Sequence, residues 1–462
     1  MKLPPQLDMP RFLQRLTWIA DPVKYMETAF QKYPDIFRAE ILGFGDNLLF
    51  VQHPEAMRQI LTKDRTTFFA SGRENGILQP LLGNYSIVML EGDRHKKRRK
   101  LLLPPFHGER MQAYSNGICN LTERIFAQLP LNQTLTARNI TQDISLQVIL
   151  EAVYGLQTGE RSQKIKQLLA NVANIFRSPL TSAFLFFPSW QKDLGAWSPW
   201  GYFMRQQKQL DQLIYQEIAE RREEDNQERQ DILSLLMSAR DEQGQPLTDQ
   251  ELRDELMALM FAGHETTATA MAWALYWIHR LPEVRSKLLA ELDSLGEYPE
   301  PMAIAKLPYL NAVCQETLRI CPVGMLTFPR VVQEPTELLD YHLEPGMVVV
   351  GCIYLAHQRE DIYPEAKQFK PERFLDKQYS PYEFIPFGGG ARRCIGEALA
   401  QMELKLAIAT ILSNYEIDLA SQKPEKPKRR GVTLAPAHGV KIIIKGKRQP
   451  PARSISKQKA IV

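Results

Sequence analysis

The sequence predicts a mainly α-helical protein with small β-sheets, and three observations lead to this fold class. Helical periodicity dominates from Arg94 to about Arg319. The stretch from Arg330 to Ile353 is β-rich and turns at Glu344-Pro345-Gly346. After a last helix from Cys394 to about Ser413, short strands are expected again between Gly431 and Lys445.

Three further elements are placed by their boundary residues. A helix is expected from Asp21 to Tyr33, and the alternation from Phe37 to Val51 predicts a hairpin. One long helix is expected from Thr248 to Leu281, because Thr248 and Glu251 form a capping box at its start. Pro282 stops this helix.

The length and the cysteines limit the class of protein. A chain of 462 residues exceeds the usual size of one hydrophobic core, so two lobes or a large two-part domain are expected. The five cysteines are odd in number and scattered, unlike a disulfide framework, which fits a reducing compartment. The first residues form neither a signal peptide nor an apolar stretch long enough to span a bilayer. We therefore expect a cytoplasmic protein with no transmembrane anchor.

Two basic runs stand out in a chain whose net charge is only +4. They are Lys96 to Lys100 and Lys426 to Arg430. Binding of nucleic acid is not expected, because no aromatic residues interleave with these runs and no reader motif accompanies them. The basic, polar residues 446–462 are expected to form a flexible tail after a single domain that spans residues 1–445.

A glycine-rich run from Phe387 to Gly396 presents a single cysteine, Cys394, just before an apolar helix. One thiolate with no second Cys or His beside it cannot build a tetrahedral zinc site. It can serve as the only protein ligand of a haem iron, where a thiolate favours cleavage of the O–O bond. The neighbouring glycines let backbone N–H groups approach and tune the sulfur. The alternative is an inert free cysteine in a glycine-rich loop.

Five residues of this run match every fixed position of the pattern Phe-x-x-Gly-x-Arg-x-Cys-x-Gly: Phe387, Gly390, Arg392, Cys394 and Gly396. The chain here resembles the cytochromes P-450, of the soluble bacterial type, and the resemblance covers essentially its full length. It implies haem b held between a long central helix and the cysteine loop, with Cys394 as the metal ligand. The residues expected to contact the cofactor from this loop are Phe387, Gly388, Arg392, Ile395 and Gly396.

The long helix carries the polar run Ala262-Gly263-His264-Glu265-Thr266 at its middle. Gly263 costs helix stability, and we attribute it to close approach of the backbone to the cofactor face. The Thr266 hydroxyl is expected to bond the Ala262 carbonyl and open the helix locally. The resemblance assigns Thr266 and Glu265 as the pair that carries protons to the oxygen site. The alternative is a polar kink in a core helix, and His264 is expected to be a packing residue.

Basic residues elsewhere are candidates for the haem propionates. His95 and Arg99 lie at i, i+4 on a basic helix, a spacing that the family uses for this purpose, and Arg330 and Arg392 are further candidates. Each is a weak signal alone, since a basic helix is usually a solvated face. The remaining cations of this helix are expected to face an electron donor.

A second charged group is expected to be structural. Glu316 and Arg319 share one helix face at i, i+3, and Arg373 lies in Lys370-Pro371-Glu372-Arg373-Phe374. These match the family's Glu-x-x-Arg and Pro-Glu-Arg-Phe elements, so we expect a buried Glu–Arg–Arg cluster that locks the loop under the haem. A surface ion pair is the alternative for Glu316 and Arg319 alone.

The segment from Ile175 to Phe203 is dense in large apolar residues, and the resemblance makes it the roof of the substrate cavity. Residues Val323 to Phe328 are expected to line the cavity too, and Arg73 is a candidate for holding a carboxylate. The chain is similar to cyanobacterial relatives that hydroxylate fatty acids or sesquiterpenes, so a long-chain fatty acid is the favoured substrate and a terpenoid the alternative. The roof could equally pack on the core or rest on a membrane surface.

These observations predict a haem-thiolate monooxygenase that uses O2 and two electrons from a separate ferredoxin or flavodoxin system. No flavin or dinucleotide-binding motif is present in the sequence. A haem-thiolate isomerase or peroxygenase is a second possibility, which the Glu265–Thr266 pair opposes. A non-catalytic haem sensor or carrier is a third, although no output module is visible.

Overall fold

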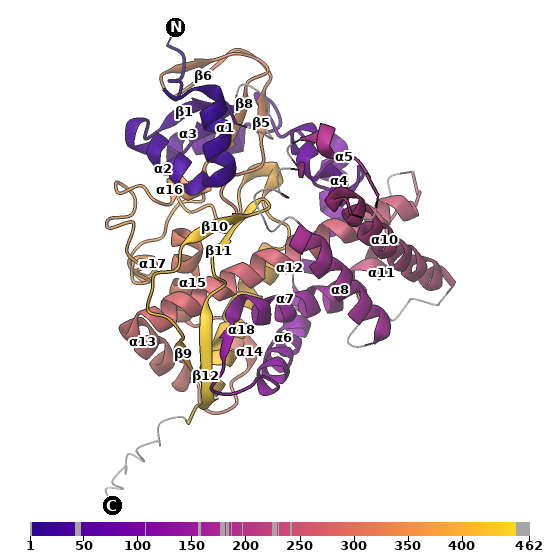
Figure 1. The fold of residues 1–462 in the computed structure, drawn as a ribbon, viewed down its shortest axis with the longest axis vertical. Coiled ribbons are helices and arrows are strands. Elements are labelled where there is room, and N and C mark those ends of the chain that lie inside the picture. The colour runs from indigo at the N-terminus through magenta and orange to yellow at the C-terminus, as the bar shows by residue number, and fades with distance from the viewer. Residues whose placement is uncertain are drawn as a thin grey trace, which may run out of the picture.

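The computed structural model describes residues 2–41, 48–106, 108–155, 159–175, 181, 184–185, 187–195, 197–223, 229, 231–240 and 243–449. A large helical lobe carries a smaller β-rich lobe at its N-terminal end (Figure 1). The β-rich lobe combines the start of the chain with residues that follow α15, so segments far apart in sequence lie side by side in it. The predicted fold class, mainly helical with small sheets, is confirmed.

The helices dominate the chain from α5 to α15, as the periodicity predicted. Those of the N-terminal part are α1 (Arg11–Ala20), α2 (Pro22–Lys32), α3 (Pro54–Thr62), η1 (Arg73–Leu78), α4 (Gln79–Leu82) and α5 (Gly92–Leu102). The helical lobe is built from η2 (Pro104–Phe106), α6 (Glu109–Ala127), α7 (Ala137–Tyr154), α8 (Glu160–Ile175), η3 (Pro188–Trp190), α10 (Pro199–Glu223), α11 (Ile232–Ser238), α12 (Asp249–Arg280), α13 (Pro282–Asp293), α14 (Pro301–Ile304) and α15 (Pro308–Ile320). Towards the C-terminus follow α16 (Ile353–Ala356), α17 (Arg373–Asp376), η4 (Gly390–Arg392) and α18 (Glu397–Asn414).

In the described part of the chain, the strands form four small sheets. The largest sheet has the order β1-β2-β8-β5-β3, built from β1 (Ile36–Ala39), β2 (Leu48–Val51), β3 (Phe68–Phe69), β5 (Arg330–Val332) and β8 (Val348–Gly351). Strands β2 and β8 pair in parallel, which joins the N-terminal hairpin to the later β-rich stretch. The remaining strands are β4 (Thr134–Thr136), β6 (Thr336–Leu338), β7 (Tyr341–Leu343), β9 (Tyr415–Leu419), β10 (Pro427–Arg430), β11 (Thr433–Pro436) and β12 (Lys441–Lys447). The turn of the predicted first hairpin, residues 42–47, lies outside the described residues.

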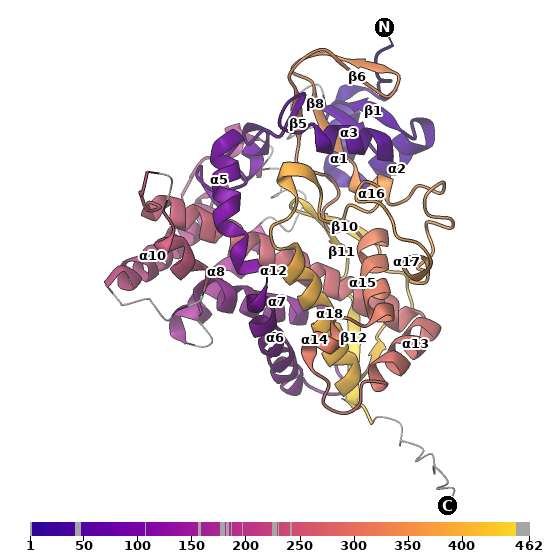
Figure 2. The ribbon, with the colours of Figure 1, turned by 180° about the vertical axis from the view of Figure 1, so that it is seen from behind.

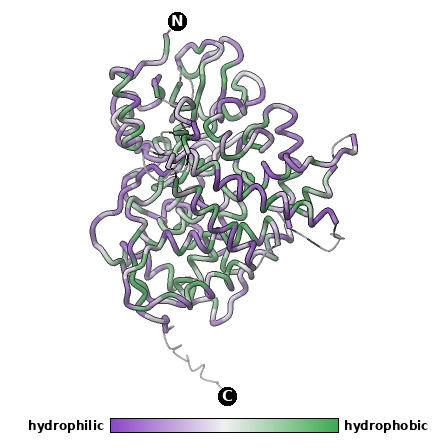
Figure 3. The backbone as a smooth tube through the Cα atoms, turned by 45° about the vertical axis from the view of Figure 1, so that its right-hand side comes forward, coloured by the Kyte–Doolittle hydropathy of each residue, from purple (hydrophilic) through white to green (hydrophobic). Residues whose placement is uncertain are grey.

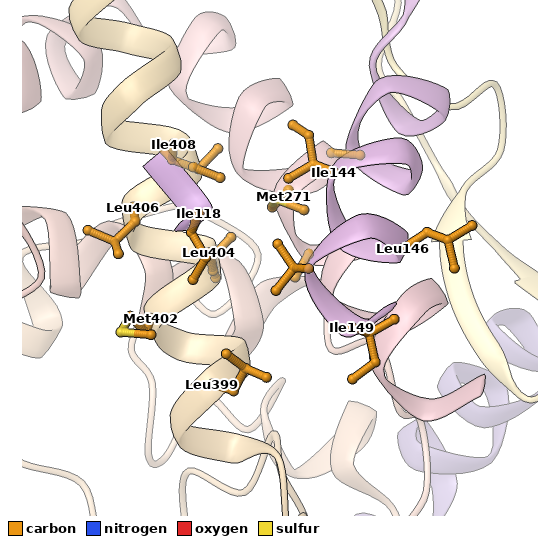
Figure 4. Packing of buried hydrophobic residues seen from close by; sticks show 14 of the residues in the cluster. Ile118, Ile144, Leu146, Ile149, Met271, Leu399, Met402, Leu404, Leu406 and Ile408 are labelled. Atoms are coloured by element: carbon orange, nitrogen blue, oxygen red, sulfur yellow. The ribbon is translucent and has the colours of Figure 1, made fainter. Parts of the chain in front are cut away.

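Helix α12 runs through the helical lobe, and α7, α18 and α15 pack around it (Figures 1 and 2). Thr248 and Glu251 form the predicted capping box at its start, so its boundaries are confirmed. Ile144 of α7 meets Met271 of α12, and Ile118 of α6 meets Leu404 of α18 (Figure 4). Figure 3 shows hydrophobic stretches running through this lobe. The lobe therefore holds α12 in a fixed position on which a site can be built.

Two predicted boundaries near the C-terminus were wrong. The last helix begins at Glu397 and not at Cys394, because residues 390–392 first form the short turn η4 and Gly396 caps the helix. Strand β12 continues to Lys447, so the expected domain end at residue 445 falls inside a strand. The backbone N–H of Arg448 then donates to the Asn414 carbonyl at 2.9 Å. Residues 450–462, most of the predicted tail, lie outside the described residues.

Candidate active site

The loop that presents Cys394 is shaped by backbone hydrogen bonds. The Cys394 N–H donates to the Phe387 carbonyl at 3.0 Å, which closes the loop on itself. Gly388 and Gly390 have φ of +66° and +63°, a conformation that only glycine adopts without strain. The Gly396 N–H hydrogen-bonds the sulfur. The predicted role of the glycines in bringing the backbone to the sulfur is confirmed in geometry.

The thiol of Cys394 opens onto a pocket. Cys394 is exposed, although it lies between α5 and α18. A pocket of about 380 Å³ accounts for this exposure, and it is lined by Arg99, Leu103, Arg393, Cys394, Ile395, Glu397, Ala398 and Gln401. Many protein atoms nevertheless lie near the sulfur and keep water from it, and this desolvation raises the pKa of the Cys394 thiol to about 11. A cation bound to the sulfur would favour the thiolate and oppose this effect.

Asp64 holds the loop from the β-rich lobe. Its carboxylate accepts from the Ala391 N–H at 2.6 Å and pairs with Arg330 at 3.5 Å. A Cβ atom at Gly390 would lie 2.0 Å from this carboxylate, so the glycine is required both for its φ and for space. Sequence reasoning missed Asp64, because an isolated Asp after α3 carries no motif.

The four predicted propionate ligands gather around this loop. Arg330 donates to the Gly389 carbonyl at 2.8 Å, and Arg99 donates to the Arg393 carbonyl at 2.6 Å. Arg392 directs its terminal nitrogens to backbone carbonyls, those of Ala70 at 2.9 Å and Leu90 at 2.6 Å among them. The buried Nε atoms of Arg330 and Arg392 have no hydrogen-bond partner among the residues that the structure describes.

Burial disfavours positive charge throughout this cluster, and neighbouring cations add to the effect at Arg392 and His95. Burial lowers the pKa of Arg330 to about 10, and burial together with Arg330 lowers that of Arg392 to about 10. Burial, Arg392 and Arg99 lower the pKa of His95 to about 3. A cluster of this kind fits an anionic ligand, which would satisfy the unpartnered N–H groups and the excess positive charge.

On the facing helix, Ala262 is exposed in the middle of a long buried stretch of α12. Thr266, one turn later, is half-buried, and its hydroxyl donates to the Ala262 carbonyl at 2.5 Å. The predicted hydrogen bond is therefore confirmed. The predicted opening of the helix was wrong, since α12 is helical without interruption from residue 249 to 280.

The predicted reason for Gly263 was also wrong. A Cβ atom there would lie 2.7 Å from Cδ1 of Ile149, which belongs to α7. The Ser145 hydroxyl of the same helix donates to the Gly263 carbonyl at 2.9 Å. The glycine lets α7 and α12 approach each other and does not clear the face that Ala262 exposes.

The predicted Glu–Arg–Arg cluster is buried and complete. Arg319 donates to Glu316 at 2.6 and 2.8 Å, and Arg373 donates to Glu316 at 3.2 Å. Arg319 also donates to the His357 carbonyl at 2.8 Å, and Nε2 of His357 accepts from the Ile385 N–H at 3.0 Å. Burial lowers the pKa of His357 to about 3, so its ring is neutral and can accept this bond. His357, which sequence reasoning missed, thus links the cluster to the cysteine loop.

Comparison with known proteins decides the family. Residues 4–443 match the family described as cytochrome P-450. The chain is 31% identical to a putative cytochrome P-450 135B1 of Mycobacterium tuberculosis, covering 98% of this chain and 94% of the relative. It is 32% identical to a putative cytochrome P-450 135A1 of the same species, covering 95% and 94%. This chain belongs to the cytochrome P-450 family.

Solved structures agree on the fold. A retinoic-acid-bound cyanobacterial cytochrome P-450 is similar with a TM-score of 0.84 at 23% identity, covering 96% of this chain and 99% of that one. The haem domain of cytochrome P-450DA has a TM-score of 0.83 at 21% identity, covering 97% and 98%. The protein is accordingly a haem-thiolate monooxygenase with haem b and an axial cysteine thiolate. When bound, haem supplies the oxygen and electron chemistry, and the protein supplies its binding site.

The residues present fit that cofactor. Cys394 is the single sulfur on the loop, and among the described residues no three His, Cys, Asp or Glu side chains converge as a metal site. The cationic cluster of His95, Arg99, Arg330 and Arg392 gathers around the loop, and Ala262 and Thr266 lie on one turn of α12. Their contacts with the cofactor stay predictions, as do those of Phe387, Gly388 and Ile395.

Proposed function

We propose that this P-450 hydroxylates a long-chain fatty acid, with a sesquiterpene or other terpenoid as the second candidate. The observation that carries this proposal is one apolar cluster that includes the turn of α12 before the exposed Ala262. It joins Leu81 and Leu82 of α4 to Trp200 and Phe203 of α10 and to Ala258 of α12. Ala258 lies one helical turn before Ala262. A substrate near Ala262 would therefore contact mainly aliphatic and aromatic carbon.

Part of the segment from Ile175 to Phe203, the predicted roof of the substrate cavity, belongs to this cluster. Phe184, Leu185, Trp200 and Phe203 belong to the cluster, whereas Phe176 and Phe186 lie outside the described residues. Val323 and Met325 are buried as well. The length and apolarity of the roof support a long apolar chain, and the retinoic acid bound by one structural neighbour is itself an apolar acid.

Arg73 provides a candidate contact for the acid group. It is exposed at the start of η1, the turn that leads into α4 and therefore into the apolar cluster. An exposed arginine at the edge of an apolar cluster can hold a carboxylate while the chain extends inward. This geometry favours a fatty acid over its alcohol.

Titration of the absorption spectrum tests the proposal. A long-chain fatty acid should shift the haem from low to high spin with higher affinity than the alcohol of equal chain length. Arg73→Gln should remove this preference, whereas Lys63→Gln, which changes another exposed cation, should not. A shift with a sesquiterpene but with no fatty acid would replace the fatty acid by the terpenoid. Substrate-dependent consumption of NADPH and O2 would separate both from a sensor or carrier.

We further propose that an acidic ferredoxin or flavodoxin docks on the outer face of α5. Arg94, Lys96, Lys97 and Lys100 are exposed there, and Arg393 extends this basic face beside Cys394. Opposite charge steers association, so the rate of electron transfer should fall as ionic strength rises. The double change Lys96→Gln and Lys100→Gln should lower the rate of electron transfer at low salt. Lys423→Gln, a change of an exposed cation between β9 and β10, should not. A rate independent of salt would contradict the docking.

Exposed apolar side chains in the segment from Ile175 to Phe203 support a contact with a membrane surface. No helix in the described part of the chain is both long and apolar enough to cross a bilayer. Trp190, Leu194 and Trp197 are nevertheless exposed, Trp197 to 78%. We propose that this patch rests on a membrane surface, which co-sedimentation with vesicles of neutral and anionic lipid would test. Absence of sedimentation with either kind of vesicle would contradict the contact and favour the cytoplasm, and equal sedimentation of the protein and of Trp197→Ser would remove Trp197 from the contact.

A further inference from the structure

Glu265 leaves α12 in a different direction from the Thr266 hydroxyl. Successive residues of an α-helix point about 100° apart, so the two side chains leave the helix in different directions. Thr266 bonds within its own helix, to Ala262. The Glu265 carboxylate accepts instead from Arg138 and Gln142 of α7 and pairs with Arg430 of β10. Its position is therefore set by two elements outside α12.

The contacts that α7 and β10 make with the Glu265 carboxylate differ in strength. On the α7 side, Arg138 and Gln142 bind one carboxylate oxygen each, and Arg138 also donates to Gln142 at 3.2 Å. From β10, Nε of Arg430 lies 3.6 Å from Oε2 of Glu265, the oxygen that Arg138 also binds, and the side chains of Arg430 and Glu265 are nearly buried, at 14% and 12% exposed. The contact with Arg430 is the longer of the two, so it is the one that a small movement of β10 would change most.

Arg430 is the last residue of β10, which forms a hairpin with β11. This hairpin contacts the segment from Val323 to Phe328, which is predicted to line the substrate cavity. Strands β10 and β11 are joined by Gly431 and Val432, and they lie between the β-rich lobe and α12 in both ribbon views (Figures 1 and 2). The Leu434 N–H donates to the Val323 carbonyl at 2.9 Å, and Thr433 bridges Gly324. The tip residue Val432 is 42% exposed.

The strand before the tip is anchored on its other face. Side chains alternate along a strand, and the guanidinium of Arg429 stacks on the ring of Trp18 in α1 at 4.5 Å. Strand β10 therefore holds α1 with one arginine and reaches Glu265 with the next. A ligand that presses on Val432 can turn the tip while Arg429 keeps the strand attached.

We propose that Arg430 is a positioning residue for Glu265, through which occupancy beside Val323 and Val432 influences proton delivery. Arg430 draws the carboxylate towards the hairpin, against the pull of Arg138 and Gln142. Without Arg430 the carboxylate is held by α7 alone, further from the substrate side. The inference rests on the proposed proton-relay role of Glu265, but the contact itself is testable without any substrate.

The first test is a double-mutant cycle on the denaturation midpoint of the purified holoenzyme. Arg430→Gln should lower the midpoint in the wild-type chain and change it less when Glu265→Gln is already present. Lys428→Gln, an exposed cation on the same strand, should have the same small effect in both backgrounds. Fully additive effects of Arg430→Gln and Glu265→Gln would overturn the proposal.

The second test measures how much hydrogen peroxide forms per NADPH consumed. It is done with any ligand that shifts the haem spin state. Arg430→Gln should bind the ligand within about twofold of the wild-type affinity, yet release several-fold more hydrogen peroxide per NADPH. Arg430→Lys should restore most of the coupling, which a purely structural role for the guanidinium would not explain. Peroxide release equal to that of Lys428→Gln would overturn the proposal. If fatty acids produce no spin shift but a terpenoid does, the substrate proposal fails and this test proceeds with the terpenoid.

Discussion

The carboxylate of Asp64 accepts a hydrogen bond from the backbone N–H of Ala391 at 2.6 Å, so the β-rich lobe holds the cysteine loop from outside. The same carboxylate pairs with Arg330, which is fully buried. One acidic side chain thus sets both the loop and one of the cations predicted to face the haem. The site is assembled between the lobes and does not belong to either one alone.

Asp64→Ala should therefore destabilise the protein and loosen its hold on haem. Removing one partner of a buried pair leaves a buried charge, at a cost of about 3–5 kcal/mol. Urea unfolding and transfer of haem to apomyoglobin would measure the two effects. Asp8→Ala, which breaks an exposed pair with Lys32, is the control and should change neither. Unchanged haem transfer in Asp64→Ala would contradict this account of the loop.

Gly263→Ala should destabilise the protein although alanine favours helices. Its Cβ would lie 2.7 Å from Ile149, and overpacking of this kind costs about 1–3 kcal/mol. Ile149→Val in the same chain should recover part of the loss, because it removes the nearest atom. At Gly117 of α6 the nearest atom to an added Cβ lies 3.8 Å away, so Gly117→Ala should stabilise by up to about 1 kcal/mol. Stabilisation by Gly263→Ala would contradict the packing role.

Thr266→Ala should still fold and bind haem, but it should lose the coupling of NADPH consumption to product formation. The variant loses the hydroxyl that lies on the exposed turn of α12, and with it the proposed path for protons. Hydrogen peroxide formed per NADPH should rise several-fold, while Thr266→Ser, which keeps the hydroxyl, should stay near the wild type. Equal peroxide yields in wild type and Thr266→Ala would remove Thr266 from the mechanism.

Glu403 should make stability depend on pH. Burial raises the pKa of this carboxyl from 4.5 to about 8, and a hydrogen bond with Ser145 only partly opposes the shift. Between pH 4.5 and about 8, the folded protein keeps a proton that the unfolded chain releases. The contribution of Glu403 to the free energy of unfolding is therefore full below pH 4.5 and is lost as the pH rises to about 8. Relative to wild type, Glu403→Gln should gain stability across that range in urea unfolding. Glu283→Gln, at an exposed position, should show no such trend, and a parallel pH dependence for Glu403→Gln and wild type would disprove the assignment.

Local patterns predicted the parts of the site that are local. The loop of Cys394, the bond from Thr266 to Ala262 and the pairing of Glu316 with Arg319 all join residues within a few positions of each other. Spacing along the chain therefore decides these contacts. Arg373 joined this set only because it lies in a recognisable sequence element.

Contacts between distant segments could not be predicted in the same way. Asp64, His357 and Arg430 reach the site from other elements, and nothing in their neighbouring residues indicates a partner. Gly263 was assigned the wrong neighbour because a glycine in a helix shows only that something approaches closely. Which element approaches is settled by the packing of α7, which depends on the whole lobe.

The absorption spectrum of the haem-loaded protein, compared with that of Cys394→Ser, tests the central claim most directly. We predict a thiolate-type spectrum for the wild type and its loss in Cys394→Ser, with circular dichroism showing the same helical content in both. Cys314→Ser and Cys321→Ser, changes of buried cysteines far from the loop in sequence, should keep the thiolate-type spectrum. A thiolate-type spectrum in Cys394→Ser would contradict the assignment of Cys394 as the ligand.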